Sequence, residues 1–377
     1  MAESRAHVRI TRTRLADGRA LTYYDDSEPY SSGAATRALH DPRELPLCRA
    51  QPTMRLDVLT GEWIILAPHR MDRTHLPDSS SCPLCPSRDG MLTEIPAEDC
   101  DVVVFENRFP SFAAPTAAVP ARVDADPLWP QLPANGRCEI MCFTSEHDSS
   151  FAQLTPRRVA TVIEAWADRT RALSALSGVR QVFCFENRGA ETGVTLHHPH
   201  GQIYALPFVA PRTGRLLARA VAHRDRTGRD LLSDVLAAEL RAGTRVVHHG
   251  TAWTAYVPAA ARWPVELHLM PHRAIPDFVS LNPAERLELA TLYPALLRRV
   301  NEFFTDQGNP EPVPYIAAWH QAPTGPGREL TRLHLQLFSV RRAAGKLKYL
   351  AGSESGIGVW LNDTTPERIA HRLRELA

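Results

Sequence analysis

One pattern occurs twice along this chain, and it constrains the fold more than any other feature. In the first half, Thr155-Pro156 begins a segment with helical spacing of apolar residues, and a short extended stretch containing His200-Gly-Gln202 follows. In the second half, Asn282-Pro283 begins a similar segment, and His334-Leu-Gln336 follows at a similar distance. Threonine or asparagine before proline is a typical helix start, because the side chain caps the first turn and proline fits its first position. The repeat indicates an ancestral duplication.

The duplication predicts an α+β protein with two lobes. A chain of 377 residues with 44% hydrophobic residues is long enough for two such units. We expect residues 1–47 to form an N-terminal extension with a hairpin, because Asp17-Gly18 favours a tight turn between two extended stretches. Residues 48–210 would form the first lobe and residues 211–377 the second. The boundary follows Pro207-Phe-Val-Ala-Pro211, where an arginine-rich linker begins.

Composition argues against several classes of partner. The net charge of +1 with 23% charged residues gives no electrostatic reason to expect nucleic acid or a membrane, whereas small anionic substrates are compatible with it. No apolar run approaches the roughly 18 residues that a membrane span requires, and Met1–Ile10 has no apolar signal segment. We therefore expect a cytoplasmic protein. Seven scattered cysteines, an odd number, argue against a disulfide framework and for free thiols with a metal-binding pair.

The stretch 195–206 holds the most unusual side chains. Because successive residues of a strand alternate between its faces, His198, His200 and Gln202 would share one face. Three interpretations are open: the histidines are structural, they bind a metal ion, or one imidazole nitrogen attacks phosphorus and forms a phosphoramidate. The last two are compatible if His198 binds the metal and His200 attacks. Gln202 would then donate a hydrogen bond to a phosphoryl oxygen.

A Cys-x-x-Cys pair lies in a predicted loop at Cys82 and Cys85. Such pairs are redox-active in some proteins, but no βαβ redox unit surrounds this one, which favours half of a zinc site. One or two of the histidines would complete a tetrahedral set of ligands.

Isolated basic residues supply weaker candidates for anion binding. The only lysines, Lys346 and Lys348, precede a predicted tight loop at Ala351-Gly-Ser353 in a chain that otherwise uses arginine. They indicate a phosphate or sugar-phosphate contact, with plain surface charge as the alternative. For Arg70 and Arg73, in a loop after a predicted strand, solvated charge is an equal alternative to a functional role.

Several motifs together resemble the galactose-1-phosphate uridylyltransferase family of the histidine-triad superfamily. They are His198-Pro-His200-Gly-Gln202-Ile, Cys82-x-x-Cys85, Leu59-Thr-Gly-x-Trp63 within Arg55–Arg73, Phe185-Glu-Asn187-x-Gly189 and Trp319-His320-x-Ala-Pro323. The match runs from about Arg55 to the C-terminus, and the combination is far more specific than any single motif. The resemblance implies two duplicated histidine-triad-like lobes, each an antiparallel sheet with packed helices.

The resemblance also implies a ping-pong reaction of galactose metabolism. UDP-glucose would transfer its uridylyl group to His200 and release glucose-1-phosphate, and galactose-1-phosphate would then take that group to give UDP-galactose. Gln202 would stabilise the uridylyl phosphate. Hydrolytic relatives place a third histidine at the position of Gln202, where it protonates a poor leaving group. A sugar phosphate already leaves as a stable anion and needs no such acid.

By the same resemblance, further residues receive roles, and one structural zinc is implied. The implied zinc ligands are Cys82, Cys85, His147 and His198. The implied nucleotide and phosphate contacts are Arg70, Arg73, Asn107, Asn187 and Thr195. The implied hexose-phosphate contacts are Lys348 and Glu354. In the family the segment with these last two residues reaches the active site of a partner subunit, so a homodimer with shared active sites is implied.

Two departures from the family pattern bear on the site. Some members hold a second metal with a glutamate and three histidines. His320 and His334 match two of these, but Gln336 replaces the third and no glutamate follows Pro207 at the expected place. We therefore predict that the second metal site is absent. Arg108 stands where many members have an aspartate near the ribose.

Two other functions stay open at this point. One is a related phosphorylase or adenylyltransferase that acts on ADP-sugars or dinucleotides, and the other is a zinc-stabilised nucleotide-binding protein without turnover. Intact His200 and Gln202 count against the second. The sequence does not decide between zinc and iron, the breadth of nucleotides and sugar phosphates accepted, or the role of residues 1–47.

Overall fold

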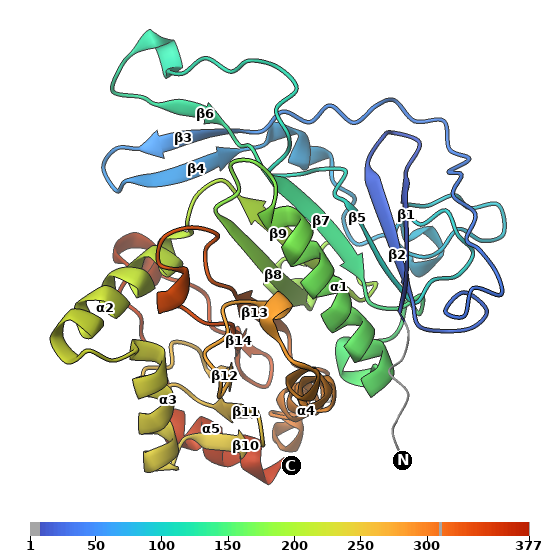
Figure 1. Cartoon of the computed structure of the whole chain (residues 1–377). Helices are drawn as coiled ribbons and strands as arrows, with labels where there is room; N and C mark the ends of the chain where they lie inside the picture. Colours follow the sequence, from blue (N-terminus) through green and yellow to red (C-terminus); the bar gives the residue numbers. More distant parts are fainter. Residues whose placement is uncertain (1–7, 309–310, 377) are drawn as a thin grey trace.

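The computed structural model describes residues 8–308 and 311–376, and an 11-stranded antiparallel sheet organises it. In sheet order its strands are β1 (Arg9–Arg14), β2 (Ala20–Asp25), β5 (Val102–Glu106), β7 (Arg137–Cys142), β9 (His200–Leu206), β8 (Gln181–Arg188), β13 (Tyr315–His320), β14 (His334–Ser339), β12 (Val265–Pro271), β11 (Trp253–Tyr256) and β10 (Val246–His249). The smaller ladders are β4 (Glu62–Leu66), β3 (Thr53–Asp57) and β6 (Gln131–Pro133), and β15 (Arg341–Ala343) with β16 (Lys346–Leu347). The three-stranded ladder stands apart from the large sheet (Figure 1).

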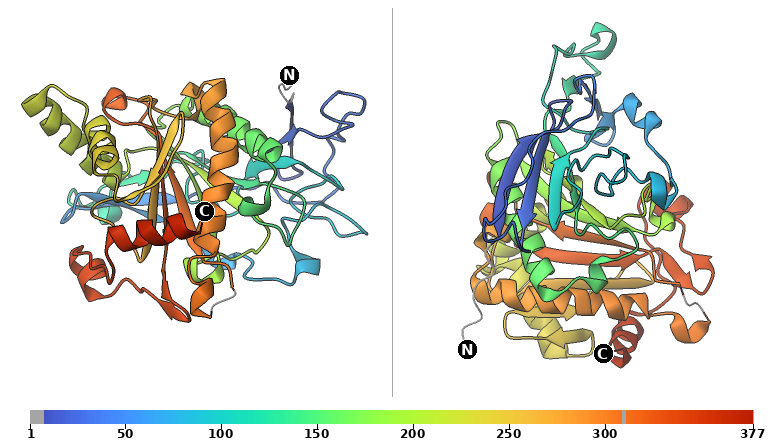
Figure 2. Two further views of the ribbon diagram at one scale, coloured as in Figure 1. Left: turned by 90° about the horizontal axis from the view of Figure 1, so that it is seen from below. Right: turned by 90° about the vertical axis from the view of Figure 1, so that its right-hand side faces the viewer.

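The described residues form five α-helices, and two of them cover one face of the large sheet. They are α1 (Pro156–Ser174), α2 (Pro211–Thr227), α3 (Leu231–Ala242), α4 (Pro283–Asn301) and α5 (Pro366–Glu375). Helices α1 and α4 lie side by side in both views (Figures 1 and 2). Thr155 caps α1 and Asn282 forms a capping box with Glu285 in α4, which confirms both predicted helix starts. Among the described residues, no helix combines the length and the hydropathy that a membrane span requires.

The α+β prediction is confirmed, and the two half-sheets are joined edge to edge. Strand β8 of the first half pairs with β13 of the second, so that Phe185 lies opposite Ala318. The two histidine-x-glutamine strands, β9 and β14, flank this seam symmetrically in the order β9-β8-β13-β14. Such symmetry is what a duplicated unit produces. The boundaries expected at residues 47/48 and 210/211 stay a prediction.

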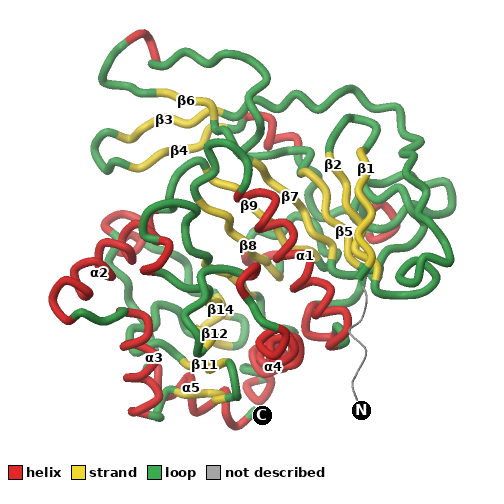
Figure 3. The backbone as a smooth tube through the Cα atoms, in the orientation of Figure 1, coloured by secondary structure: helices red, strands yellow, loops and turns green. Residues whose placement is uncertain are grey.

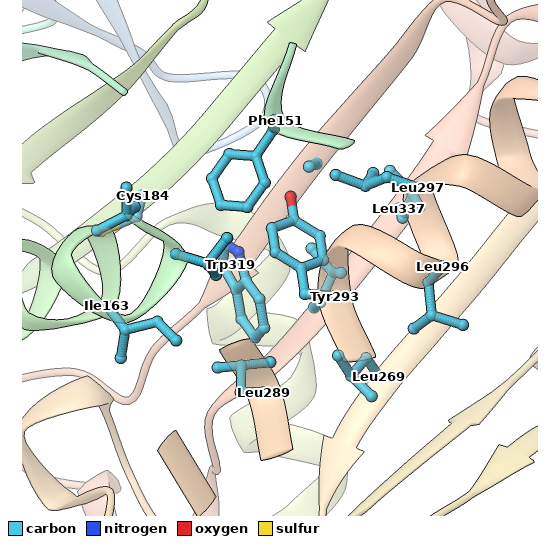
Figure 4. Packing of buried hydrophobic residues seen from close by; sticks show 14 of the residues in the cluster. Phe151, Ile163, Cys184, Leu269, Leu289, Tyr293, Leu296, Leu297, Trp319 and Leu337 are labelled. Carbon is cyan, nitrogen blue, oxygen red and sulfur yellow. The ribbon is translucent and has the colours of Figure 1, made fainter. Parts of the chain in front are cut away.

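The largest apolar core runs across the seam beneath α1 and α4. Trp319 of β13 lies at its centre, with ring centroids 5.9 Å from Trp166 of α1 and 5.5 Å from Tyr293 of α4. Phe151, which precedes α1, lies 4.7 Å from Tyr293 by the same measure. Figure 4 shows the rings of Trp319, Tyr293 and Phe151 among aliphatic side chains of both halves, such as Ile163 and Leu289. The two halves therefore bury a shared core.

The hairpin expected at Asp17-Gly18 is present and adds to the large sheet. Gly18 has φ +85°, a conformation that glycine adopts without strain. β2 pairs with β5, so the hairpin covers what would otherwise be the edge of the first half-sheet. Much of the chain between β4 and β7, beside this hairpin, is loop (Figure 3).

A buried carboxyl at the seam predicts a pH-dependent stability. Burial raises the pKa of Glu186 to about 7, and one of its oxygens accepts a hydrogen bond from Tyr315 at 3.1 Å. The protonated form is favoured in the folded state, so stability should fall as the pH rises from the unfolded pKa through 7, by about 1.4 kcal/mol per pH unit. Glu186→Gln keeps the hydrogen bond and removes this contribution. Measured from pH 5 to 8, the unfolding free energy of the variant should increase relative to that of the wild type as the pH rises. Parallel curves of unfolding free energy against pH would contradict the prediction.

Candidate active site and metal centre

Strand β9 presents its two faces to different surroundings. Ile203 is buried in the apolar core, and Gly201 has no room for a side chain, because a Cβ there would lie 2.8 Å from Phe143 Cζ. His200 and Gln202 face away from the core and are partly exposed, as strand alternation predicted. The apolar face thus seats the strand, and the polar face is free for chemistry.

His200 is held in the tautomer that a nucleophile needs. Its Nδ1 lies 2.7 Å from the backbone carbonyl oxygen of His198. A carbonyl only accepts, so Nδ1 carries the proton and Nε2 keeps its lone pair. Burial lowers the pKa of His200, which favours the neutral ring. A neutral imidazole with an unprotonated Nε2 can attack an electrophilic centre.

Gln202 is oriented by a residue that the sequence argument did not name. Tyr204 donates its hydroxyl hydrogen to Gln202 Oε1 at 3.0 Å. With that oxygen occupied, the amide NH₂ of Gln202 is available as a donor beside His200. Tyr204 lies two residues further along the same strand, so the alternation that grouped His200 with Gln202 was a signal for it as well.

Four side chains form a cluster with the composition of a zinc site. The potential ligand atoms of Cys82, Cys85, His147 and His198 all lie within 4.8 Å of one another. Cys85 Sγ is 3.3 Å from His147 Nδ1 and 3.5 Å from His198 Nδ1, separations that fit ligands on one tetrahedral ion. His198 Nε2 donates to the carbonyl oxygen of Thr144 at 2.9 Å, which leaves Nδ1 as the ligating nitrogen. The residues present therefore fit a zinc ion.

His198 and His200 lie in different surroundings. His198 precedes β9, is 1% exposed and lies in the cysteine cluster, while His200 begins the strand. Because the two residues are joined through Pro199 and through the His200 Nδ1 contact to the His198 carbonyl, the cluster and His200 are rigidly linked.

A cavity of about 390 Å³ lies beside His200, and both halves of the chain line it. Asn187 and His200 contribute from the first half, and Pro314 and Arg341 from the second. Thr195 lies between two lining residues. The structure thus places Asn187 in the lining of the cavity beside the predicted nucleophile, whereas Thr195 is not among the described residues that line it. The phosphate-binding roles of both residues stay predictions.

The two predicted nucleotide-binding arginines lie near each other at the Tyr204 end of the polar face. Arg70 donates to the carbonyl oxygen of Phe109 at 2.7 Å, and Arg73 donates to the Arg70 carbonyl oxygen at 2.9 Å. Burial and the adjacent Arg70 lower the pKa of Arg73. Burial raises the pKa of Tyr204 to about 12, and the nearby Arg70 opposes that rise. The arrangement offers two close positive charges to an anion.

Asn107 and Arg108 lie away from the cavity beside His200. Asn107 Oδ1 accepts from the Phe109 N–H at 2.8 Å, and the residue lines a separate cavity of about 300 Å³. The Arg108 guanidinium is half exposed and lies 3.9 Å from Glu94. The predicted contact of Asn107 with a nucleotide stays a prediction.

Lys348 and Glu354 contact each other within the chain. Lys348 Nζ lies 3.1 Å from Glu354 Oε1, and Ser353 and Lys348 lower the pKa of Glu354 to about 2. Neither is among the described residues that line the cavity beside His200. The single chain therefore does not bring these two predicted hexose-phosphate contacts to the nucleophile.

The second half carries a polar cluster at the equivalent position. His334 Nδ1 lies 2.9 Å from the carbonyl oxygen of Arg332, a contact of the same kind as that of His200 Nδ1 with the His198 carbonyl. The His334 ring stacks on the His320 ring, with 4.8 Å between the ring centroids. Gln336 donates to Glu266 Oε1 at 2.7 Å. Glu266, on β12, was not predicted, because only the pairing of β12 with β14 brings it to Gln336.

Comparison with known proteins agrees with this geometry. The family model "Galactose-1-phosphate uridyl transferase, N-terminal domain" matches residues 44–210, and its C-terminal counterpart matches residues 218–377. A galactose-1-phosphate uridylyltransferase from Streptomyces lividans is 44% identical over 97% of this chain and 98% of its own, and one from Thermotoga maritima is 31% identical over 85% and 98%. A solved uridylyltransferase structure has a TM-score of 0.74 at 30% identity, over 86% of this chain and 98% of that one. This chain therefore belongs to the galactose-1-phosphate uridylyltransferase family.

Proposed function

We propose that this chain exchanges UMP between UDP-glucose and galactose-1-phosphate. His200 Nε2 attacks the α-phosphorus of UDP-glucose, the bond from that phosphorus to the bridging oxygen breaks, and glucose-1-phosphate leaves as an anion. A phosphate oxygen of galactose-1-phosphate then attacks the uridylyl phosphorus, the P–N bond breaks, and UDP-galactose leaves. The observation that carries this proposal is the His200 Nδ1 contact to a carbonyl, which keeps Nε2 unprotonated beside the cavity.

Gln202 would stabilise the charge that develops on the phosphoryl oxygens. We expect Gln202→Ala to lower kcat about 10²-fold or more, because removing one fixed hydrogen-bond donor at a developing anion has that cost. KM for UDP-glucose should change much less. Steady-state kinetics of both half-reactions would measure the split. An unchanged kcat would show that the Gln202 amide does not contact the reacting phosphate.

One structural zinc is proposed at Cys82, Cys85, His147 and His198. Bound there, the ion would join the cysteine loop to the residue that positions His200. The second metal is still predicted to be absent, and the contact of Gln336 with Glu266 supports this. The amide N–H of Gln336 occupies Oε1 of Glu266, the carboxylate that β12 places beside the His334 strand.

A homodimer with shared active sites is proposed as well. Lys348 and Glu354 belong to a segment that exposes many large apolar side chains. They are Tyr349, Leu350, Ile357, Val359, Trp360 and Leu361. A patch of this kind on a soluble chain is typical of an interaction surface. Burial of this segment against a second copy would cover it and would bring Lys348 to the partner's cavity.

A donor comparison tests the proposed reaction. With galactose-1-phosphate as acceptor, the protein should release glucose-1-phosphate from UDP-glucose much faster than from ADP-glucose. Faster turnover of ADP-glucose would favour the related phosphorylase or adenylyltransferase. Release from neither donor would favour a nucleotide-binding protein without turnover. The same comparison with other sugar phosphates would define the breadth of acceptors.

A further inference from the structure

We propose that residues 8–43 act as a brace for the metal centre and slow the loss of its ion. The brace is defined here as these residues, and the metal loop as residues 82–100, which begins with the two cysteine ligands. The inference rests on the zinc site proposed above. The brace lies outside the matched family models, the first of which begins at residue 44.

Backbone pairing places the brace beside the end of the metal loop. The loop leads into β5, which begins at Val102. β2 of the brace pairs with β5 along its length, from Tyr24 opposite Val102 to Leu21 opposite Phe105. The strand that anchors the C-terminal end of the metal loop is thus an interior strand of the sheet because the brace is present.

An apolar cluster joins the brace to the metal loop through side chains. Its fully buried members from the brace are Leu15, Leu21 and Tyr23. Its members from the loop are Cys82, Leu84, Ile95 and Cys100, and the sheet contributes Val103, Phe105 and Cys142. Cys82, a proposed zinc ligand, is itself 1% exposed within this cluster. Displacing the brace would expose the backbone and side chain of a ligand to water.

Two arginines of the brace converge on one carboxylate of the metal loop. Arg19 and Arg43 both bind Glu94, the second at 3.2 Å. Arg19 is also held by Asp17 at 2.7 Å, and Arg43 by Asp41 at 2.8 Å. All of these groups are at most 10% exposed at the side chain, so water screens the pairs weakly.

Hydrogen bonds carry this restraint from Glu94 to the cysteines. The Glu94 N–H donates to the carbonyl oxygen of Pro83, between the two cysteines, at 3.0 Å. The adjacent Thr93 hydroxyl donates to the carbonyl oxygen of Cys85 at 2.5 Å. Fixing Glu94 therefore fixes the backbone that presents both thiolates. Groups that hold ligands in this way commonly change metal affinity 10- to 100-fold when removed.

A second contact holds the C-terminal end of the metal loop. Arg37 of the brace lies 2.6 Å from Asp25, in the same brace, and donates to the carbonyl and side-chain oxygens of Asp99 at 2.8 and 3.0 Å. Its guanidinium also stacks over Tyr30 at 4.0 Å from the ring centroid. Arginines of the brace thus restrain the metal loop at two points, Glu94 and Asp99.

The rate of zinc release tests the proposal. The zinc-loaded full chain is mixed with excess chelator, and release is followed at a temperature where every variant is folded. Glu94→Gln keeps the size of the side chain and removes the charge that both arginines bind. We expect it to release zinc about tenfold faster than the wild type or more. Arg43→Gln removes one of the two arginines and should accelerate zinc release by a smaller factor. It replaces Glu94→Gln as the test if that variant does not fold.

Glu239→Gln is the matched control, because Glu239 is also a buried carboxylate paired with an arginine, Arg245 at 2.9 Å, but lies in α3 of the second half. It should release zinc at the wild-type rate. Wild-type release in both Glu94→Gln and Arg43→Gln, or an equal acceleration in Glu239→Gln, would overturn the brace while leaving the zinc site intact. A wild-type chain that binds no zinc would overturn the metal site itself, and the brace with it.

Discussion

Replacing His200 with asparagine should lower the rate of uridylyl transfer by a factor on the order of 10⁴ or more. Asparagine can still donate to the His198 carbonyl, but its amide nitrogen has no lone pair able to attack phosphorus. UDP-glucose labelled in the uridylyl phosphate provides the direct measurement. Wild-type protein should carry acid-labile label after removal of free nucleotide, and the variant should carry none.

The same substitution at an unrelated histidine controls for nonspecific loss of activity. His371 lies on α5, and its side chain is 68% exposed. The His371→Asn variant should be labelled and should turn over substrate as the wild type does. Equal labelling of His200→Asn would show that another group is the nucleophile. An unlabelled wild type would argue against any covalent uridylyl intermediate.

Cys82→Ser should remove the metal and much of the stability that it provides. A serine hydroxyl is a poor zinc ligand, and three remaining ligands hold the ion weakly. At a free zinc concentration a thousandfold above Kd, bound metal stabilises a fold by about 4 kcal/mol, and the variant should lose about that amount. Elemental analysis of the purified proteins and denaturant unfolding with and without zinc would measure both effects.

Cys48→Ser is the matched control, because Cys48 is a partly exposed thiol outside the ligand cluster. It should keep its metal and its stability. Treating the wild type with a strong chelator should reproduce the unfolding curve of Cys82→Ser. A wild type whose stability is the same with and without metal would contradict a structural role for the ion.

Local chemistry let the sequence predict the helix starts, the duplicated order and the polar face of β9. Thr155 and Asn282 cap helices through their own next few residues. The alternation around His200 and Gln202 follows from backbone geometry alone. These features depend on neighbours in the chain, and so the sequence by itself determined them. The metal ligands came from the family resemblance, and the structure brings all four together.

Tertiary structure alone decided which distant segments meet. The pairing of β8 with β13 makes one sheet and one cavity from two halves, and the pairing of β12 with β14 sets Glu266 against Gln336. The brace reaches the metal loop across many intervening residues through Glu94. Such contacts depend on how the whole fold buries its apolar faces and pairs its buried charges. No period or motif in the sequence indicates which distant strand or side chain will be the partner.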